Sequence, residues 1–143
     1  MLGWRKVNRK NCLNPIKIST TRKGYIGQEI VSDYLLRKNL RVYTPVVDDF
    51  GVDLLVEKYG KYTSIQVKYH TTFTNQASIQ VRILPTIADW IATPLHINKK
   101  TKIIWYKNNR KTEKYTVAFA VNKPKNNQVK KINFYKNFLK APF

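Results

Sequence analysis

Two short runs of alternating residues, joined by a turn, constrain the fold of this chain more than any other feature. The first run, from Gly51 to Lys58, reads GVDLLVEK, and the second, from Tyr62 to His70, reads YTSIQVKYH. Both are rich in aliphatic and β-branched residues, and Tyr59-Gly60-Lys61 between them is a turn signal. The sequence therefore predicts a β-hairpin with two antiparallel strands.

The alternation gives each strand of this hairpin a core face and a second, more polar face. The aliphatic positions expected to face the core are Val52, Leu54, Val56, Ile65 and Val67. Asp53, Gln66 and Lys68 are left together on the other face. Opposed positions in such a hairpin sum to about 120, so Asp53 is expected near residue 67 and beside both Gln66 and Lys68.

The rest of the chain predicts one helix followed by strands. Apolar residues recur at i and i+4 from Gly24 to Asn39, which indicates a helix. Further strands are expected at Arg41–Val47, Ser78–Leu84, Asp89–Thr93, Lys102–Lys107 and Thr116–Val121, and a short helix at Asn133–Lys140. The strands on either side of Asn98-Lys99-Lys100 are expected to pair as a second hairpin. The order of elements is typical of an α+β or mixed α/β fold.

The chain is expected to form a single domain over residues 1–143. Its length of 143 residues suits one hydrophobic core, and no repeat, low-complexity tract or flexible linker is visible. Residues 1–22 are polar and basic with few periodic apolar positions. We interpret them as a basic arm that becomes ordered on a partner.

The charge predicts a polyanionic partner. There are 27 Lys and Arg residues against 8 Asp and Glu, a formal net charge of +19. A compact state with this charge repels itself, and binding of nucleic acid relieves the repulsion. A basic surface that only aids solubility is the alternative.

Several other classes of function are disfavoured. Cys12 is the one cysteine, so a disulfide framework or a cysteine zinc site is not expected. No apolar run is long enough for a membrane span, and the first residues lack a secretory leader, so we expect an intracellular, cytoplasmic protein that meets DNA. No phosphate-binding glycine loop is present, and thus no nucleotide cofactor is expected. His70 and His96 are isolated, which argues against a histidine-based nuclease site.

Asp53, Gln66 and Lys68 are suited to phosphodiester hydrolysis. A divalent ion stabilises charge on the phosphate and acidifies water. Carboxylate, amide and carbonyl oxygens suit Mg²⁺, which keeps several of its own waters. A nearby lysine orients the attacking water or stabilises the transition state.

The pattern resembles the PD-(D/E)XK nuclease superfamily, whose signature is a helix Glu, an Asp and a (D/E)-X-K element across a hairpin. Its parts here are Glu29 in GQEIVSDYLL, Asp53 in DDFGVDLLV and Gln66-Val67-Lys68 in SIQVKYH. The resemblance covers about residues 23–70. It implies a restriction-endonuclease-like core, a central mixed β-sheet flanked by helices. It also implies catalytic roles for Glu29, Asp53, Gln66 and Lys68, and a Mg²⁺ site, in which Mn²⁺ substitutes, made by Asp53, Gln66, the Val67 carbonyl and water held by Glu29.

Two positions depart from the superfamily pattern. Val52 stands where a proline is usual, and Gln66 replaces the acidic residue of the (D/E)XK element. The second change removes one negative charge from the metal site and is expected to weaken metal binding. It is similar to homing endonucleases of cyanobacterial group I introns, whereas the helix opening RKGYIGQE is similar to archaeal Holliday-junction resolvases. We prefer a site-specific double-stranded DNA endonuclease of the homing type. A resolvase and a catalytically inactive DNA-binding protein are the alternatives.

Basic and polar side chains outside the active site are expected to contact DNA, mostly at phosphates. Gln80 and Arg82 alternate on one strand and have the chemistry to read A and G edges in a major groove. The predicted contacts are Lys17, Arg22, Lys23, His70, Gln80, Arg82, Lys99, Lys100, Lys102, Lys107, Arg110 and Lys111. Because one site cuts one strand, a homo-oligomer, dimer or tetramer, is expected.

Overall fold

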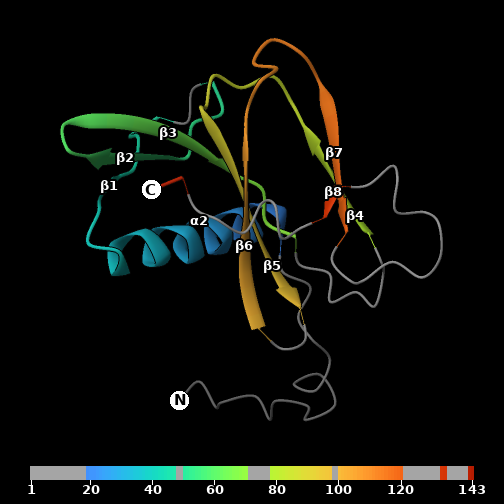
Figure 1. Cartoon of the computed structure of the whole chain (residues 1–143), viewed down its shortest axis with the longest axis horizontal. Coiled ribbons are helices and arrows are strands. Elements are labelled where there is room, and N and C mark those ends of the chain that lie inside the picture. Colours follow the sequence, from blue (N-terminus) through green and yellow to red (C-terminus); the bar gives the residue numbers. More distant parts are fainter. Residues whose placement is uncertain (1–18, 48–49, 71–77, 98–99, 121–132, 135–141) are drawn as a thin grey trace, which may run out of the picture.

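The computed structural model describes residues 19–47, 50–70, 78–97, 100–120, 133–134 and 142–143. They form one helix, a five-stranded mixed sheet of order β1-β2-β3-β5-β6, and a three-stranded sheet of order β4-β7-β8 (Figure 1). The chain therefore has the expected α+β fold with a central mixed sheet. Lys17, Lys99, Cys12 and the arm up to residue 18 lie outside the described residues.

Helix α2 spans Thr20–Arg37 and begins four residues before the expected start. Ser19 is its N-cap, because the Ser19 hydroxyl accepts a hydrogen bond from the Arg22 N–H at 3.3 Å. The helix ends before Asn39, which has a left-handed φ of 61°. Within the described residues, no helix is long and apolar enough to cross a membrane.

The predicted hairpin is formed by β2 (Leu54–Lys58) and β3 (Lys61–Val67). Its turn contains only Tyr59 and Gly60, with φ values of 52° and 76°, as in the two-residue turns that match strand twist. Leu54 consequently pairs with Ile65, and Lys58 with Lys61. Lys61 belongs to the strand and not to the turn, so Asp53 comes opposite Gln66 and not residue 67.

The other strands of the large sheet extend from this hairpin. β1 (Arg41–Tyr43) pairs antiparallel with β2, and β3 pairs parallel with β5 (Trp90–Ile97). β5 and β6 (Lys100–Lys107) form the expected second hairpin. β5 continues beyond the expected end at Thr93, and Pro94 lies opposite Ile103 in the antiparallel pair.

The second sheet contains β4 (Ser78–Ile83), β7 (Tyr115–Ala120) and β8 (Asn133–Phe134). β4 pairs antiparallel with β7, and β8 pairs parallel with β7. The prediction of a helix beginning at Asn133 is wrong for the first two residues, which are a strand because they hydrogen-bond to the free edge of β7. Residues 135–141 lie outside the described residues.

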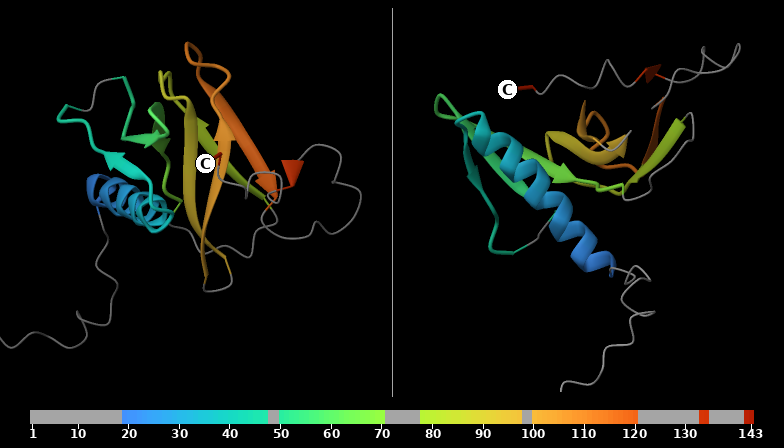
Figure 2. Two further views of the ribbon diagram at one scale, coloured as in Figure 1. Left: turned by 60° about the vertical axis from the view of Figure 1, so that its left-hand side comes forward. Right: turned by 90° about the horizontal axis from the view of Figure 1, so that it is seen from below.

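The large sheet has a hydrophobic cluster on each face. One cluster joins Val31 and Leu35 of α2 to Leu54, Ile65 and other residues of the sheet. The second joins Ile79, Val81 and Ile83 of β4 to Ile91 and Ile104 among others. Figure 2 shows α2 at one side of the molecule and the β4–β7 pair at the other. Among the described residues the second face is covered by a sheet and not by the helix expected there.

Candidate functional site

Asp53 stands just before β2, where the hairpin opens away from its turn. Its N–H donates to the Ile65 carbonyl at 2.9 Å. Its carboxylate accepts hydrogen bonds from the Val67 N–H at 2.7 Å and from the Gln28 side-chain amide at 3.2 Å. The half-buried carboxylate is thus fixed between β3 and α2.

Gln66 lies opposite Asp53 on the neighbouring strand and is only 8% exposed. Its side-chain oxygen Oε1 is buried and has no hydrogen-bond partner among the described residues. An unpaired buried carbonyl oxygen is costly, and a cation or a bound water would satisfy it. Among the described residues around Asp53, the Oε1 atom of Gln66 is therefore the best candidate to bind a cation or a water.

Lys68 follows directly after β3. Its N–H donates to the Ala92 carbonyl at 2.9 Å, and the His70 N–H donates to the Pro94 carbonyl at 3.0 Å. The main chain thus continues alongside β5, and the alternation of side chains continues with it. Gln66, Lys68 and His70 are therefore on one side of the strand, and both Lys68 and His70 are half-buried.

The helix residue that reaches Asp53 is Gln28, whereas the sequence analysis singled out Glu29. The buried face of α2 carries Gly27, Val31 and Leu35, and Glu29 is exposed. At about 100° per residue, Glu29 points nearly opposite to that face. Its predicted part in a metal site remains a prediction, and the contact from Gln28 was missed because the helix phase relative to Asp53 is set by tertiary packing.

The oxygen donors fit a weakly charged magnesium site. The described residues contain no group of three or more His, Cys, Asp or Glu side chains able to hold a metal ion. Asp53 and the unpaired Oε1 of Gln66 supply two hard oxygens on adjacent strands. Mg²⁺ is commonly held by one or two carboxylates and several waters, so this pair suits it better than it suits zinc.

The loop before Asp53 is held by a buried hydrogen-bond network that sequence reasoning missed. The Thr86 hydroxyl is 3.0 Å from both the Phe50 and the Gly51 carbonyl oxygens. The Asn108 side chain donates to the Thr86 carbonyl at 3.0 Å. A Cβ on Gly51 would lie 2.7 Å from Thr86 Oγ1 and 2.9 Å from Gln66 Nε2, so Gly51 packs directly against Gln66.

Asp89, directly before β5, is a second, half-buried anchor. Its carboxylate accepts hydrogen bonds from the Ser64 N–H at 3.1 Å and the Ser64 hydroxyl at 3.0 Å, and pairs with Lys111 at 3.0 Å. Partial burial by itself would raise the pKa of Asp89, but the Ser64 hydrogen bonds and Lys111 outweigh burial and lower that pKa. These contacts tie β3 to β5 and support the strand that carries Gln66.

The predicted DNA-contacting residues are distributed over several elements. Arg22 and Lys23 are in the first turns of α2, and Gln80 and Arg82 are exposed on β4. His70 follows β3, and the rest of the described set lies on or after β6: Lys100, Lys102, Lys107, Arg110 and Lys111. Their contacts with DNA remain predictions.

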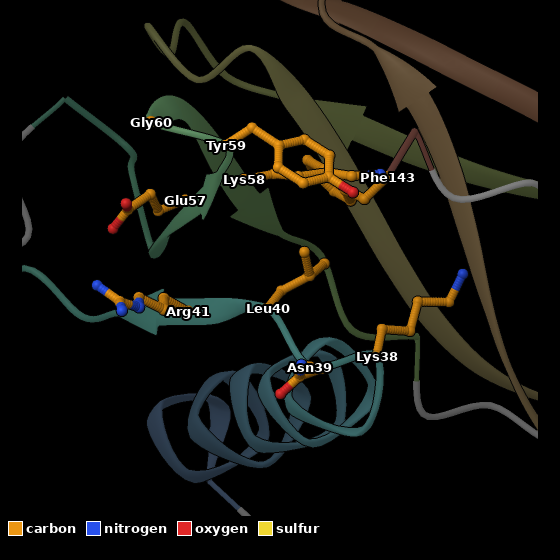
Figure 3. Close-up of a pocket in the computed structure, with 9 residues that line it drawn as sticks. All are labelled: Lys38, Asn39, Leu40, Arg41, Glu57, Lys58, Tyr59, Gly60 and Phe143. Atoms are coloured by element: carbon orange, nitrogen blue, oxygen red, sulfur yellow. The ribbon is translucent and has the colours of Figure 1, made fainter.

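A pocket of about 620 Å³ lies at the other end of the hairpin (Figure 3). It is lined by Lys38, Asn39, Leu40, Arg41, Glu57, Lys58, Tyr59, Gly60 and Phe143. None of the predicted catalytic residues borders it. The candidate site is instead the open end of the hairpin around Asp53 and Gln66.

Comparison with solved structures identifies the fold. The chain is similar to a bacterial homing endonuclease, I-Ssp6803I, with a TM-score of 0.62 over 84% of this chain and 86% of that chain. The two share a fold. Their sequence identity is 16%, so the likeness concerns architecture and not individual residues. No protein-family model matches the chain, and no curated protein matches it.

Proposed function

We propose that this chain is a metal-dependent endonuclease of the PD-(D/E)XK type that cuts double-stranded DNA at specific sites, as homing endonucleases do. The observation that carries the proposal is the position of Asp53 across the hairpin from Gln66, whose buried Oε1 has no hydrogen-bond partner among the described residues, with Lys68 two positions further along the chain. The net charge of +19 and the fold shared with a homing endonuclease support it.

Each residue of the site has a distinct task in hydrolysis. Mg²⁺, with Mn²⁺ as a substitute, supplies charge stabilisation at the phosphate and a more acidic water when bound. Asp53 and Gln66 Oε1 would hold the ion, together with the Val67 carbonyl. Lys68 would orient the attacking water or stabilise charge on the phosphate. A role for Glu29 in holding a water of the ion is implied by the resemblance alone, because Glu29 points away from the packed face of α2. The phosphorus–O3′ bond breaks, which leaves a 5′ phosphate and a 3′ hydroxyl.

The decisive experiment is cleavage of long double-stranded DNA with Mg²⁺. Discrete fragments are expected from the parent protein, and Lys68→Ala and Asp53→Asn should each reduce the rate about a hundred-fold or more. Lys61→Ala and Asp33→Asn are matched controls, because both residues are exposed and lie outside the site. Equal activity in Lys68→Ala and Lys61→Ala would remove Lys68 from the mechanism.

The second candidate is a DNA-binding protein of the same fold without catalysis. The absence of a three-ligand acidic or histidine cluster from the described residues favours it. It predicts tight binding of duplex DNA by the parent protein and no cleavage at any Mg²⁺ or Mn²⁺ concentration. Gln66→Glu then tests whether the missing negative charge is the cause, because the usual acidic ligand should restore metal-dependent cleavage.

A homo-oligomer, dimer or tetramer, is part of the proposal because cutting both strands requires two sites. Sedimentation of the purified chain checks this directly. Cleavage of a four-way DNA junction, compared with cleavage of linear duplex, distinguishes a homing endonuclease from a resolvase. A resolvase would prefer the junction.

A further inference from the structure

Two apolar side chains from distant parts of the sequence are exposed beside the candidate site. Phe50 is 73% exposed and Ile87 is 54% exposed. The Ile87 N–H donates to the Phe50 carbonyl at 3.1 Å, so the two residues are direct neighbours along the backbone hydrogen bond. Adjacent exposed apolar side chains of this kind are a feature of surfaces that contact another molecule.

The backbone at Phe50 is strained and held in place. Its φ is 62°, in the left-handed region that side chains rarely adopt. Thr86, 2% exposed, fixes the Phe50 carbonyl with its hydroxyl and accepts a hydrogen bond from the Ala88 N–H at 3.2 Å. Asn108 holds the Thr86 carbonyl, and the Tyr115 hydroxyl donates to Asn108 at 2.6 Å. Strain supported by a buried network is typical of functional positions.

The position of this pair relative to charge indicates what it contacts. Gly51, the next residue after Phe50, packs against Gln66 of the candidate site. Asn108, which anchors the network, lies between exposed Lys107 and Arg110. An exposed apolar pair beside the proposed cleavage site, joined through Thr86 and Asn108 to a segment with two exposed cations, matches duplex DNA, whose bases are apolar on their faces and whose backbone is anionic.

We propose that Phe50, with Ile87 beside it, is a wedge that stacks on a partly unstacked base of duplex DNA next to the phosphate to be cut. Lys107 and Arg110 would contact backbone phosphates flanking that base. The inference rests on the proposed function, because it takes DNA as the substrate. Beyond the proposed function, the inference states that the protein unstacks a base of the duplex, which hydrogen bonds to base edges do not require.

The test uses glycine substitutions, because glycine relieves the left-handed strain while it removes the side chain. Phe50→Gly is expected to unfold at a higher temperature than the parent yet bind DNA about ten-fold more weakly, since stacking on one aromatic is worth roughly that factor or more. Tyr59→Gly is the matched control: Tyr59 is also aromatic, 93% exposed and at a left-handed φ of 52°, but lies in the turn at the far end of the hairpin. Its binding should stay within about two-fold of the parent.

Binding is measured with the full chain in EDTA, on a fully paired duplex and on the same duplex with one central mismatch. A wedge favours the mismatched probe, because the unstacking is already done, and Phe50→Gly should lose that preference while Phe50→Trp keeps it. Equal DNA binding by Phe50→Gly and the parent overturns the wedge proposal but not the proposed nuclease function. If Phe50→Gly binds DNA as the parent does but has a changed sedimentation coefficient, the patch serves self-association instead. A loss confined to Phe50→Gly in a protein that never cleaves retains the wedge and rejects the nuclease. A parent protein that binds neither probe overturns both.

Discussion

Gly51 occupies a position where a side chain has no room. Its φ is 75°, and an added Cβ would meet Thr86 Oγ1 at 2.7 Å and Gln66 Nε2 at 2.9 Å. Both neighbours are buried and hydrogen-bonded or tightly packed, so neither yields easily. Gly51, two positions before Asp53, therefore couples the shape of the loop to the placement of Gln66.

Gly51→Ala is expected to cost about 3 kcal/mol of unfolding free energy, from left-handed strain and from overpacking. Gly60→Ala is the matched control, because Gly60 has a φ of 76° but no atom within 4 Å of the added Cβ. It should cost only the strain, about 1 kcal/mol. Urea denaturation of both variants measures the difference, and equal losses would show that the contacts around Gly51 relax without cost.

At the scale of elements, α2 lies close to the strand that carries the candidate site. A Cβ on Gly27 would lie 2.6 Å from Tyr69 Cβ and 3.3 Å from Val67 Cγ1. The position of Tyr69 Cβ is fixed by the backbone, so side-chain rotation cannot remove this contact. The close approach lets the following residue, Gln28, reach the Asp53 carboxylate at 3.2 Å.

Two alanine substitutions in α2 should therefore have opposite effects. Gly24→Ala adds a side chain where nothing lies within 4 Å and should stabilise the protein by about 0.5–1 kcal/mol, the usual gain in helix propensity. Gly27→Ala gains the same propensity but pushes the helix off β3, for a net loss of about 1–3 kcal/mol. Thermal unfolding followed by circular dichroism compares them; a stabilised Gly27→Ala would mean that α2 shifts freely on the sheet.

The strength of sequence prediction also differs between elements. The hairpin and the nearness of Asp53 to Gln66 follow from alternation and a turn signal, both local, but the register does not, because the turn contains only Tyr59 and Gly60 and shifts the partner of Asp53 from residue 67 to Gln66. The role of Gln28 depends on the rotation of α2 about its axis, which Gly27 and its contacts with β3 determine. Likewise, the network through Thr86 and Asn108 joins segments far apart in sequence, and no local pattern indicates it.

The contacts of Asp89 between β3 and β5 predict that the stability of the fold falls in acid. The pKa of Asp89 is lowered from 3.8 in the folded protein, so the ionised form stabilises the fold above about pH 4, and this stabilisation is lost as the pH falls below 3.8 through the folded value. Asp89→Asn should be less stable than the parent at pH 7, with the difference shrinking toward pH 3. Urea denaturation at several pH values measures this difference in unfolding free energy. Asp33→Asn is the control, because Asp33 is an exposed residue of α2. A difference that grows with acid would contradict the assignment.

At the scale of the whole molecule, the net charge determines how the proposed binding to DNA should depend on salt. The net charge is +19, and exposed cations of the described residues lie on several elements, among them α2, β4 and the segment around β6. Contacts with phosphates release counterions and carry no sequence information, whereas the stacking proposed for Phe50 releases none. Salt dependence therefore separates the two kinds of contact.

The last prediction uses that separation. The logarithm of the binding constant for duplex DNA should fall linearly with the logarithm of salt concentration, with a slope of about −5 or steeper if six or more phosphates are contacted. Lys107→Ala combined with Arg110→Ala should make the slope shallower by about 2, because each lost phosphate contact removes about 0.9. Phe50→Gly should lower affinity at every salt concentration without changing the slope. If the paired substitution left the slope at its parent value, the basic segment at the end of β6 would not contact DNA, and other cations of the chain would have to make the phosphate contacts.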